Sequence, residues 1–185
     1  MPDSVTAETS EQDETPERQR ILVPSPIGLL GLEFVEGIAS GLEIVPVGGR
    51  RKLYTPFAAL KTSQRSDELD ETIGRLSEYL AGARRKLDIP YDLKLTGADD
   101  FTLRLLRETA KVPYGRTRTY QQVATNIGRP GAYRQVLAAL TANPLPLIVP
   151  CHRIVPSRAG IGSYVAATAK KDWLLKMEKR RLTSG

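Results

Sequence analysis

The stretch LIVPCHRIVP, residues 147–156, places the only cysteine of the chain directly beside its only histidine. Apolar residues and prolines precede Cys151, which predicts a buried thiol at the end of an extended segment. A buried free cysteine is normally inert. The imidazole of His152 and the guanidinium of Arg153 would instead favour a thiolate, so an inert and a reactive Cys151 both remain open at this point.

A chemical partnership between these neighbours needs a special local geometry. Successive side chains diverge by about 100° on a helix and by about 180° on a strand, so Cys151 and His152 require a turn or a bridging water. Glu178 lies four residues from both Leu174 and Leu182, at the edge of an apolar helix face. It could orient the imidazole, completing a nucleophile, base and orienter set, or it could be a solvated acid among lysines.

The residues before the cysteine predict two short helices around a tight turn. Thr119 and Gln122 have the spacing of a capping box, and apolar residues at 120, 123, 124 and 127 predict a helix that ends at Gly128. GRPG, residues 128–131, predicts the turn. A second helix follows over residues 132–143, with one apolar stripe made of Tyr133, Val136, Leu137 and Leu140. The pair resembles a helix-turn-helix, although most helical hairpins bind no DNA.

The charged residues are segregated along the chain. Residues 1–20 carry 6 acids against 2 bases, residues 21–97 carry 10 and 10, and residues 98–185 carry 5 against 15, which gives net charges of −4, 0 and +10. A surplus of +10 suits a partner with phosphates. On the second predicted helix, Arg134 and Ala138 point away from the apolar stripe, so a long cation stands beside a small side chain that can approach a groove.

The remaining chain predicts an α+β fold. Residues 1–19 have the composition of a disordered acidic tail. Short β-like runs at 21–26, 29–36 and 41–47 predict a small antiparallel sheet, and an amphipathic helix follows from Ser66 to Gly82. An extended connection over residues 84–100 separates two parts near Gly97. We therefore expect an N-terminal α/β domain over residues 20–97 and a mostly helical C-terminal domain over residues 98–185.

Composition excludes several classes of protein. One cysteine forms no internal disulfide, and one cysteine with one histidine cannot complete a zinc site, so we expect no metal and no cofactor. No apolar run reaches the roughly 18 residues of a membrane span, and the N-terminus lacks the apolar core of a signal peptide. The sequence predicts a cytoplasmic protein, associated with the nucleoid in a prokaryote.

Three segments, VPYGRTRTYQQVA, NPLPLIVPCHRIV and GIGSYVAATAKKDWLLKME, resemble the O6-alkylguanine-DNA alkyltransferases, the methylated-DNA–protein-cysteine methyltransferases. The resemblance covers about residues 21 to 180 and implies an RNase H-like N-terminal lobe. It also implies DNA repair by a single irreversible transfer of the alkyl group of O6-alkylguanine, and of O4-alkylthymine, to a cysteine. The damaged base would be flipped out of duplex DNA from the minor groove by a monomer that can cluster on DNA.

The resemblance also implies roles for individual residues. Cys151 would be the alkyl acceptor, His152 the base that takes its proton through water, Glu178 the acid that orients the imidazole, and Asn143 the brace of the pocket turn. The residues that would contact the DNA or the flipped base are Tyr120, which crowds the target nucleotide, Arg134, which fills the vacated position, and Ala138, Arg153, Tyr164 and Val165.

The chain departs from the family pattern at one wall of the pocket. Most relatives carry a small polar residue and two glycines after the tyrosine, whereas this chain has Val165, Ala166 and Ala167. A narrower and stiffer pocket would disfavour bulky alkyl groups. The departure also keeps a second function open, that of a lesion sensor that flips alkylguanine without efficient transfer. A Cys-His hydrolase is a third alternative, which leaves the +10 half and Arg134 without a role.

Overall fold

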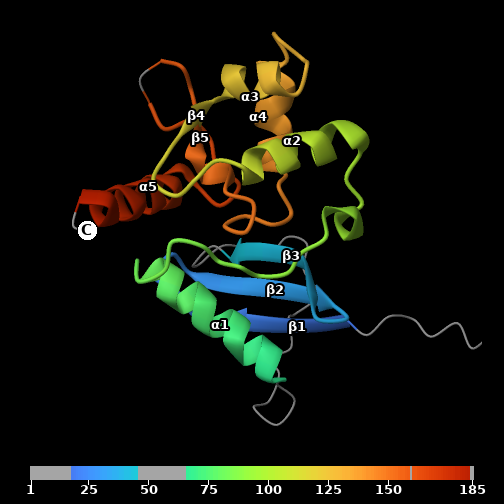
Figure 1. Ribbon diagram of the computed structural model, residues 1–185, viewed down its shortest axis with the longest axis vertical. Helices are drawn as coiled ribbons and strands as arrows, with labels where there is room; N and C mark the ends of the chain where they lie inside the picture. The colour runs from blue at the N-terminus through green and yellow to red at the C-terminus, as the bar shows by residue number, and fades with distance from the viewer. Residues whose placement is uncertain (1–17, 46–65, 159, 184–185) are drawn as a thin grey trace, which may run out of the picture.

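The computed structural model describes residues 18–45, 66–158 and 160–183. Its first layer is a three-stranded antiparallel sheet in the order β1-β2-β3, formed by β1 (Arg18–Val23), β2 (Leu29–Val35) and β3 (Ile38–Val45). Helix α1 (Asp67–Leu80) lies against this sheet in Figure 1 and buries Leu69, Leu76 and Tyr79. The α+β class that the sequence predicts is confirmed.

Two boundaries in the N-terminal part differ from the prediction. The third strand begins at Ile38 rather than at residue 41, because the turn falls at Glu36 and Gly37, which both have positive φ angles. The first strand begins at Arg18, which pairs with Val35, and ends at Val23, so residues 18–20 extend the predicted run and residues 24–26 lie outside the strand. Residues 1–17 of the predicted acidic tail, and residues 46 and 47 of the predicted third strand, lie outside the described residues.

The two helices predicted before the cysteine are confirmed as α3 (Tyr120–Asn126) and α4 (Tyr133–Thr141). They follow α2 (Asp100–Ala110), and a 3-10 turn, η2 (Leu93–Thr96), lies within the predicted extended connection. Both bonds of the capping box between Thr119 and Gln122 are present. One predicted stripe residue is wrong: Tyr133 is 40% exposed, because the stripe that α4 buries is carried by Val136 and Leu140.

A short parallel pairing, which no periodicity in the sequence predicts, joins the helical hairpin to the cysteine segment. β4 (Arg118–Thr119) pairs with β5 (Ile154–Val155), which directly follows the 3-10 turn η3 (Cys151–Arg153). The start of α3 is thereby held beside the cysteine. Helix α5 (Thr168–Thr183) then packs against η3 and closes the fold.

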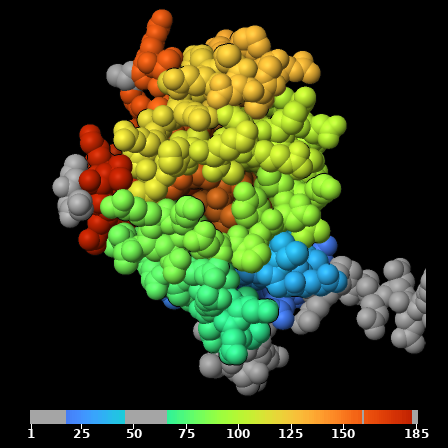
Figure 2. Space-filling model, viewed as in Figure 1, coloured from blue at the N-terminus to red at the C-terminus, as the bar shows by residue number. Residues whose placement is uncertain are grey.

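The two halves share one continuous cluster of buried apolar residues. One backbone hydrogen bond ties the sheet to the second half, from Leu42 N to Pro144 O at 2.8 Å, and another ties it to the connecting segment, from Ala39 N to Pro90 O at 3.0 Å. The segment near residue 150 lies recessed between the two halves on the face that Figure 2 shows. Within the described residues, no helix has the length and apolarity needed to cross a membrane.

Candidate active site

Cys151 and His152 lie in a buried turn rather than at the end of an extended segment. Pro150 directly precedes the 3-10 turn η3, and Arg153 N donates to Pro150 O at 2.9 Å, which closes this turn. Cys151 is 3% exposed and His152 is fully buried. The predicted extended geometry is therefore wrong at the cysteine, and the tight turn supplies the special local geometry that a Cys-His partnership requires.

Glu178 of α5 fixes the imidazole. Its Oε1 lies 2.9 Å from His152 Nε2, and both side chains are fully buried. The carboxylate also accepts from Gly115 N at 2.8 Å, on the segment that precedes β4. Because a carboxylate accepts hydrogen bonds, Nε2 carries the ring proton and Nδ1 keeps its lone pair. Nδ1 is the basic atom of the neutral ring, and it has no hydrogen-bond partner among the described residues.

Arg153 is the second partner of Glu178. Its Nε lies 3.2 and 3.1 Å from the two carboxylate oxygens, and its Nη2 donates to Oε1 at 2.9 Å. Burial by itself would raise the pKa of Glu178, but the hydrogen bonds and charges of His152 and Arg153 lower that pKa to about 2. Burial lowers the pKa of His152 against the opposing pull of Glu178. The resting site therefore contains an ionised Glu178, a charged Arg153 and a neutral His152.

The prediction that Arg153 contacts DNA is corrected by its position. Arg153 is 7% exposed, and its Nη1 donates to Val112 O at 2.7 Å while Nη2 donates to the Tyr79 hydroxyl at 3.3 Å. It lines a pocket of about 600 Å³ together with Tyr79, Tyr114 and Pro150. With every one of its nitrogens engaged in the interior, the guanidinium serves the buried charge network rather than a phosphate.

Tyr79 joins the first half of the chain to this network. Its hydroxyl, from α1, donates to Glu178 Oε1 and lies 3.4 Å from His152 Nε2. Burial is the main cause that raises its pKa well above the ordinary value, with the charge of Glu178 adding to it, so the phenol stays protonated. Sequence analysis missed Tyr79 as a site residue, because its periodicity marks only an ordinary core position of α1.

The thiol of Cys151 is protonated in the resting site. Burial raises its pKa to about 11, while a hydrogen bond from Asn143 and the charge of Lys171 act to lower it. The expectation that His152 and Arg153 favour a thiolate is therefore wrong for the resting protein. Asn143 bonds to the segment before the cysteine: its Nδ2 donates to Val149 O at 3.0 Å and its Oδ1 accepts from Leu145 N at 3.0 Å.

Lys171 is a second site residue that sequence analysis missed. It is 1% exposed, and its Nζ donates to Ile154 O at 2.5 Å, to Ser163 O at 3.3 Å and to the Tyr120 hydroxyl at 3.4 Å. Burial lowers its pKa to about 8, and the thiol of Cys151 opposes that shift. Its spacing of three residues from Leu174 and seven from Glu178 puts it on the same helix face, which was the signal available in the sequence.

Tyr120 and Tyr164 are both buried close to the Cys-His turn. Tyr120 begins α3 and is buried, and its pKa is raised mainly by burial and then by Cys151. A Cβ on Gly162 would come within 2.6 Å of the Tyr120 hydroxyl, so only glycine leaves room for this contact. Tyr164 is 8% exposed, and its ring meets that of His152 edge to face at 6.4 Å.

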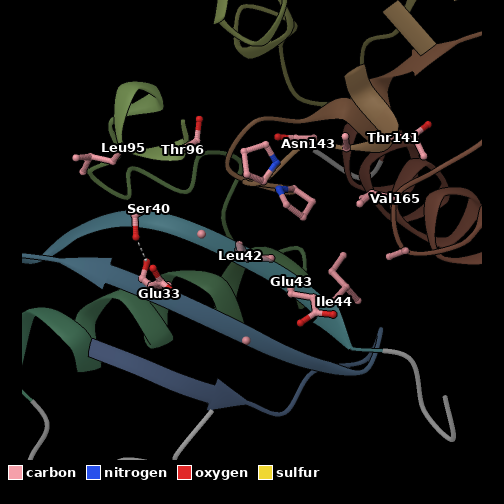
Figure 3. A pocket seen from close by; sticks show the side chains of 16 residues that line it. Glu33, Ser40, Leu42, Glu43, Ile44, Leu95, Thr96, Thr141, Asn143 and Val165 are labelled. Atoms are coloured by element: carbon pink, nitrogen blue, oxygen red, sulfur yellow. Dashed lines mark hydrogen bonds between the residues drawn. The ribbon is translucent and has the colours of Figure 1, made fainter. Parts of the chain in front are cut away.

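The loop that departs from the family pattern, residues 165–167, borders a pocket of about 710 Å³ whose lining does not include Cys151. Figure 3 shows this pocket between strand β3 and the segments above it. Val165 and Ala166 line this pocket with Asn143, so the same asparagine faces both the thiol and the pocket. Ala167 has a φ of 122°, a conformation that favours glycine. Its carbonyl nevertheless accepts from Lys170 N and Lys171 N at the start of α5.

Arg134 and Ala138 are both exposed on α4, as predicted. Arg134 Nε donates to the Tyr133 hydroxyl at 3.2 Å, and its guanidinium carbon lies 5.8 Å from the centre of that ring. The arginine thus rests on an exposed aromatic side chain and remains open to solvent. In the part of the chain that the structure describes, no three His, Cys, Asp or Glu side chains cluster to hold a metal ion.

This arrangement has clear relatives among known proteins. Residues 100–180, which hold the helical hairpin and the cysteine, match the family model described as the DNA binding domain of 6-O-methylguanine DNA methyltransferase. A methylated-DNA–protein-cysteine methyltransferase of Methanosarcina barkeri is 32% identical over 163 residues, which cover 87% of this chain and 97% of the relative. The chain belongs to the O6-methylguanine-DNA methyltransferase family.

Other members of the O6-methylguanine-DNA methyltransferase family agree in sequence and in fold. The inducible methylated-DNA–protein-cysteine methyltransferase of Bacillus subtilis is 33% identical, covering 82% of this chain and 81% of its own length. The crystal structure of the Mycobacterium tuberculosis O6-methylguanine methyltransferase has a TM-score of 0.73 at 28% identity and covers 89% of this chain and 94% of its own. The same protein in complex with DNA also matches at a TM-score of 0.73. This chain is therefore a methylated-DNA–protein-cysteine methyltransferase, a DNA-repair enzyme.

The pKa of Cys151 can be measured directly. We expect the ultraviolet absorbance of the thiolate, taken as the difference between the wild-type protein and Cys151→Ser, to rise with a midpoint near 11, because the thiol is buried. The folded chain keeps this proton to a higher pH than the unfolded chain, so stability also falls as the pH rises from about 8.5 to 11. A midpoint at or below about 8.5 would contradict the protonated resting thiol.

The variant Arg153→Met tests whether Arg153 forms a buried ion pair with Glu178 or contacts DNA. It should lower the free energy of unfolding by about 3–5 kcal/mol, because it leaves the charge of Glu178 buried without its guanidinium. Urea denaturation measures this, with the exposed Arg134→Met as the matched control, for which a change within about 0.5 kcal/mol is expected. A stability equal to that of the control would restore the DNA-contact role to Arg153.

Proposed function

We propose that this enzyme repairs O6-alkylguanine, and O4-alkylthymine, in duplex DNA by transferring the alkyl group to Sγ of Cys151 once per molecule. The observation that carries the proposal is the assembly of Cys151, Asn143 and the His152–Glu178 pair in one buried cluster. An S–C bond forms and the C–O6 bond of the nucleotide breaks. Because a thioether is a stable product, the transfer is irreversible.

His152 accepts the thiol proton, and the geometry supports a route through water. Nδ1 faces no partner among the described residues, and Sγ makes no direct hydrogen bond to it. A water between them would carry the proton from Sγ to Nδ1, and the imidazolium would be stabilised by the ionised Glu178. A thiol that is protonated at rest becomes nucleophilic through this relay.

The leaving guanine must take up a proton or a hydrogen bond as the C–O6 bond breaks. Tyr120 is a suitable donor, because burial raises its pKa and keeps it protonated. Lys171 is a positioning residue for this step, since its Nζ contacts the Tyr120 hydroxyl and carries charge close to the thiol. The pair supplies positive charge where the guanine gains electrons.

Recognition of DNA falls to the helical hairpin of α3 and α4 and to the net charge of +10 on residues 98–185. We assign Ala138 to close groove approach from the minor groove and Arg134 to the position that the flipped base leaves. Extrusion of a base costs a few kcal/mol. The exposed guanidinium of Arg134, resting on Tyr133, is available for this task.

We place the boundary between two domains near Gly97. With domains over residues 20–97 and 98–185, every proposed site residue except Tyr79 belongs to the second domain.

The alkyl groups that the pocket accepts should be small. The resemblance implies that Val165, in place of a small polar residue, forms one wall of the alkyl pocket. In support, Val165 is 37% exposed and directly follows Tyr164, whose ring meets that of His152. Ala167 holds a backbone conformation that favours glycine, so the loop has little freedom to move aside. Methyl adducts are therefore the preferred substrates, and bulky adducts should react slowly.

Cys151→Ser tests the proposed acceptor. The wild-type protein, mixed with a duplex that holds one O6-methylguanine, should gain a single methyl group on the peptide that contains Cys151, as measured by mass spectrometry. The Ser variant should gain none while binding the duplex with unchanged affinity. Methylation of the variant would refute the assignment. Tight lesion binding by an unmodified wild-type protein would instead favour the lesion sensor.

Arg134→Ala tests the proposed base flipping. Loss of the guanidinium should slow methyl transfer from duplex DNA by about tenfold or more, because nothing then replaces the extruded base in the stack. Reaction with free O6-methylguanine base should be unchanged, since no flipping is needed. Lys179→Ala, which removes an exposed cation of α5, is the matched control for charge. Equal slowing of both reactions would remove the proposed role of Arg134.

A further inference from the structure

Two buried polar atoms beside the thiol have no hydrogen-bond partner among the described residues: His152 Nδ1 and the Tyr164 hydroxyl. His152 is fully buried and Tyr164 is 8% exposed. Buried polar groups in native proteins nearly always have a partner, in the protein or in ordered water, because an unpaired group keeps its full cost of desolvation. Two such atoms in one site therefore point to a shared partner.

The two atoms belong to side chains in contact. The rings of His152 and Tyr164 meet edge to face, with centroids 6.4 Å apart and planes at 85°. The Tyr164 hydroxyl also lies within the electrostatic reach of the thiol, since its pKa is raised first by burial and then by Cys151, Tyr79 and Glu178. The hydroxyl is thus a protonated donor, unpaired among the described residues, on a ring that contacts the imidazole, and it lies within the electrostatic reach of the thiol.

A single water held between these groups would satisfy the two unpaired atoms and the thiol. Buried waters make about three hydrogen bonds to otherwise unpaired polar groups. Here the water oxygen would accept from the thiol of Cys151 and from the Tyr164 hydroxyl, and one of its hydrogens would be donated to Nδ1. Because Nε2 donates to Glu178, only Nδ1 can accept. Because both lone pairs of this water would accept hydrogen bonds, from the thiol and from the Tyr164 hydroxyl, one of its hydrogens would point at Nδ1 of His152.

We propose that Tyr164 is a positioning residue whose hydroxyl holds the water that carries the thiol proton of Cys151 to His152. The proposal rests on the function assigned to Cys151. In the relay, the S–H proton passes to the water as the water gives its own hydrogen to Nδ1, which leaves a thiolate, an imidazolium and an intact water. The O–H bond of Tyr164 does not break. This role adds to the lining role that the resemblance implies for the ring.

Tyr164→Phe tests the proposal, because phenylalanine keeps the ring and its contact with His152 and removes only the hydroxyl. We expect the second-order rate constant for methyl transfer from a duplex with one O6-methylguanine to fall by about tenfold or more at neutral pH. Without the relay, the thiolate forms only by direct ionisation, so the deficit should narrow as the pH approaches 11. A deficit that is the same at every pH would indicate a merely structural hydroxyl and overturn the proposal.

The midpoint of thermal unfolding of Tyr164→Phe provides an independent test. If the hydroxyl binds the water, its removal should lower the midpoint by about 2–4 °C; if the hydroxyl is truly unpaired, its removal should raise the midpoint. Tyr91→Phe, at an exposed tyrosine outside the site, is the control and should change neither quantity. A wild-type protein that transfers no methyl group would defeat the proposed function itself. A Phe variant that equals an active wild type would defeat only the role of Tyr164.

Discussion

The buried ion pair between Arg153 and Glu178 is the interaction on which the site depends. Two charges taken out of water are stable only when each meets several partners, and here the pair is completed by Val112 O, Gly115 N and the Tyr79 hydroxyl. These partners come from α1 and from the segment after α2, while Glu178 itself comes from α5. The same contacts that compensate the buried charges therefore hold the turn of Cys151 against the two halves of the molecule.

That network also decides the chemistry of the imidazole. An ionised Glu178 keeps the proton of His152 on Nε2, so the lone pair on Nδ1 is available on the side of the ring away from the carboxylate. The thiol does not need to be ionised at rest, and burial keeps its pKa at about 11. A protonated nucleophile beside a neutral base that is already oriented is a resting state that can be activated by one proton transfer. The charge of Lys171 acts to lower the pKa of the thiol and would favour the thiolate once it forms.

Local signals in the sequence predicted much of the fold and part of the site. The caps at Ser66 and Thr119, with the apolar periodicity that follows each cap, predicted α1 and α3, and the GRPG turn with its apolar stripe predicted α4. Such patterns can be recognised because they act within one helix. The adjacent Cys151 and His152, and Glu178 at the edge of a helical stripe, could also be found. The partnership of Arg153 could not, since nothing local distinguishes a buried arginine from one that binds phosphate. Tyr79 lies 99 residues from Glu178, and its contact exists only after both halves have packed.

Nitrogen NMR of the imidazole of His152 tests the central claim most directly, and the chain has only this one histidine, so its signals need no assignment among others. At neutral pH the account predicts a neutral ring with its proton on Nε2 and a midpoint of titration below the ordinary value of about 6.5. The same spectrum of Glu178→Gln should lose this fixed arrangement. A ring that carries its proton on Nδ1, or that is charged at neutral pH, would contradict the assignment of Nδ1 as the base that takes the proton of Cys151.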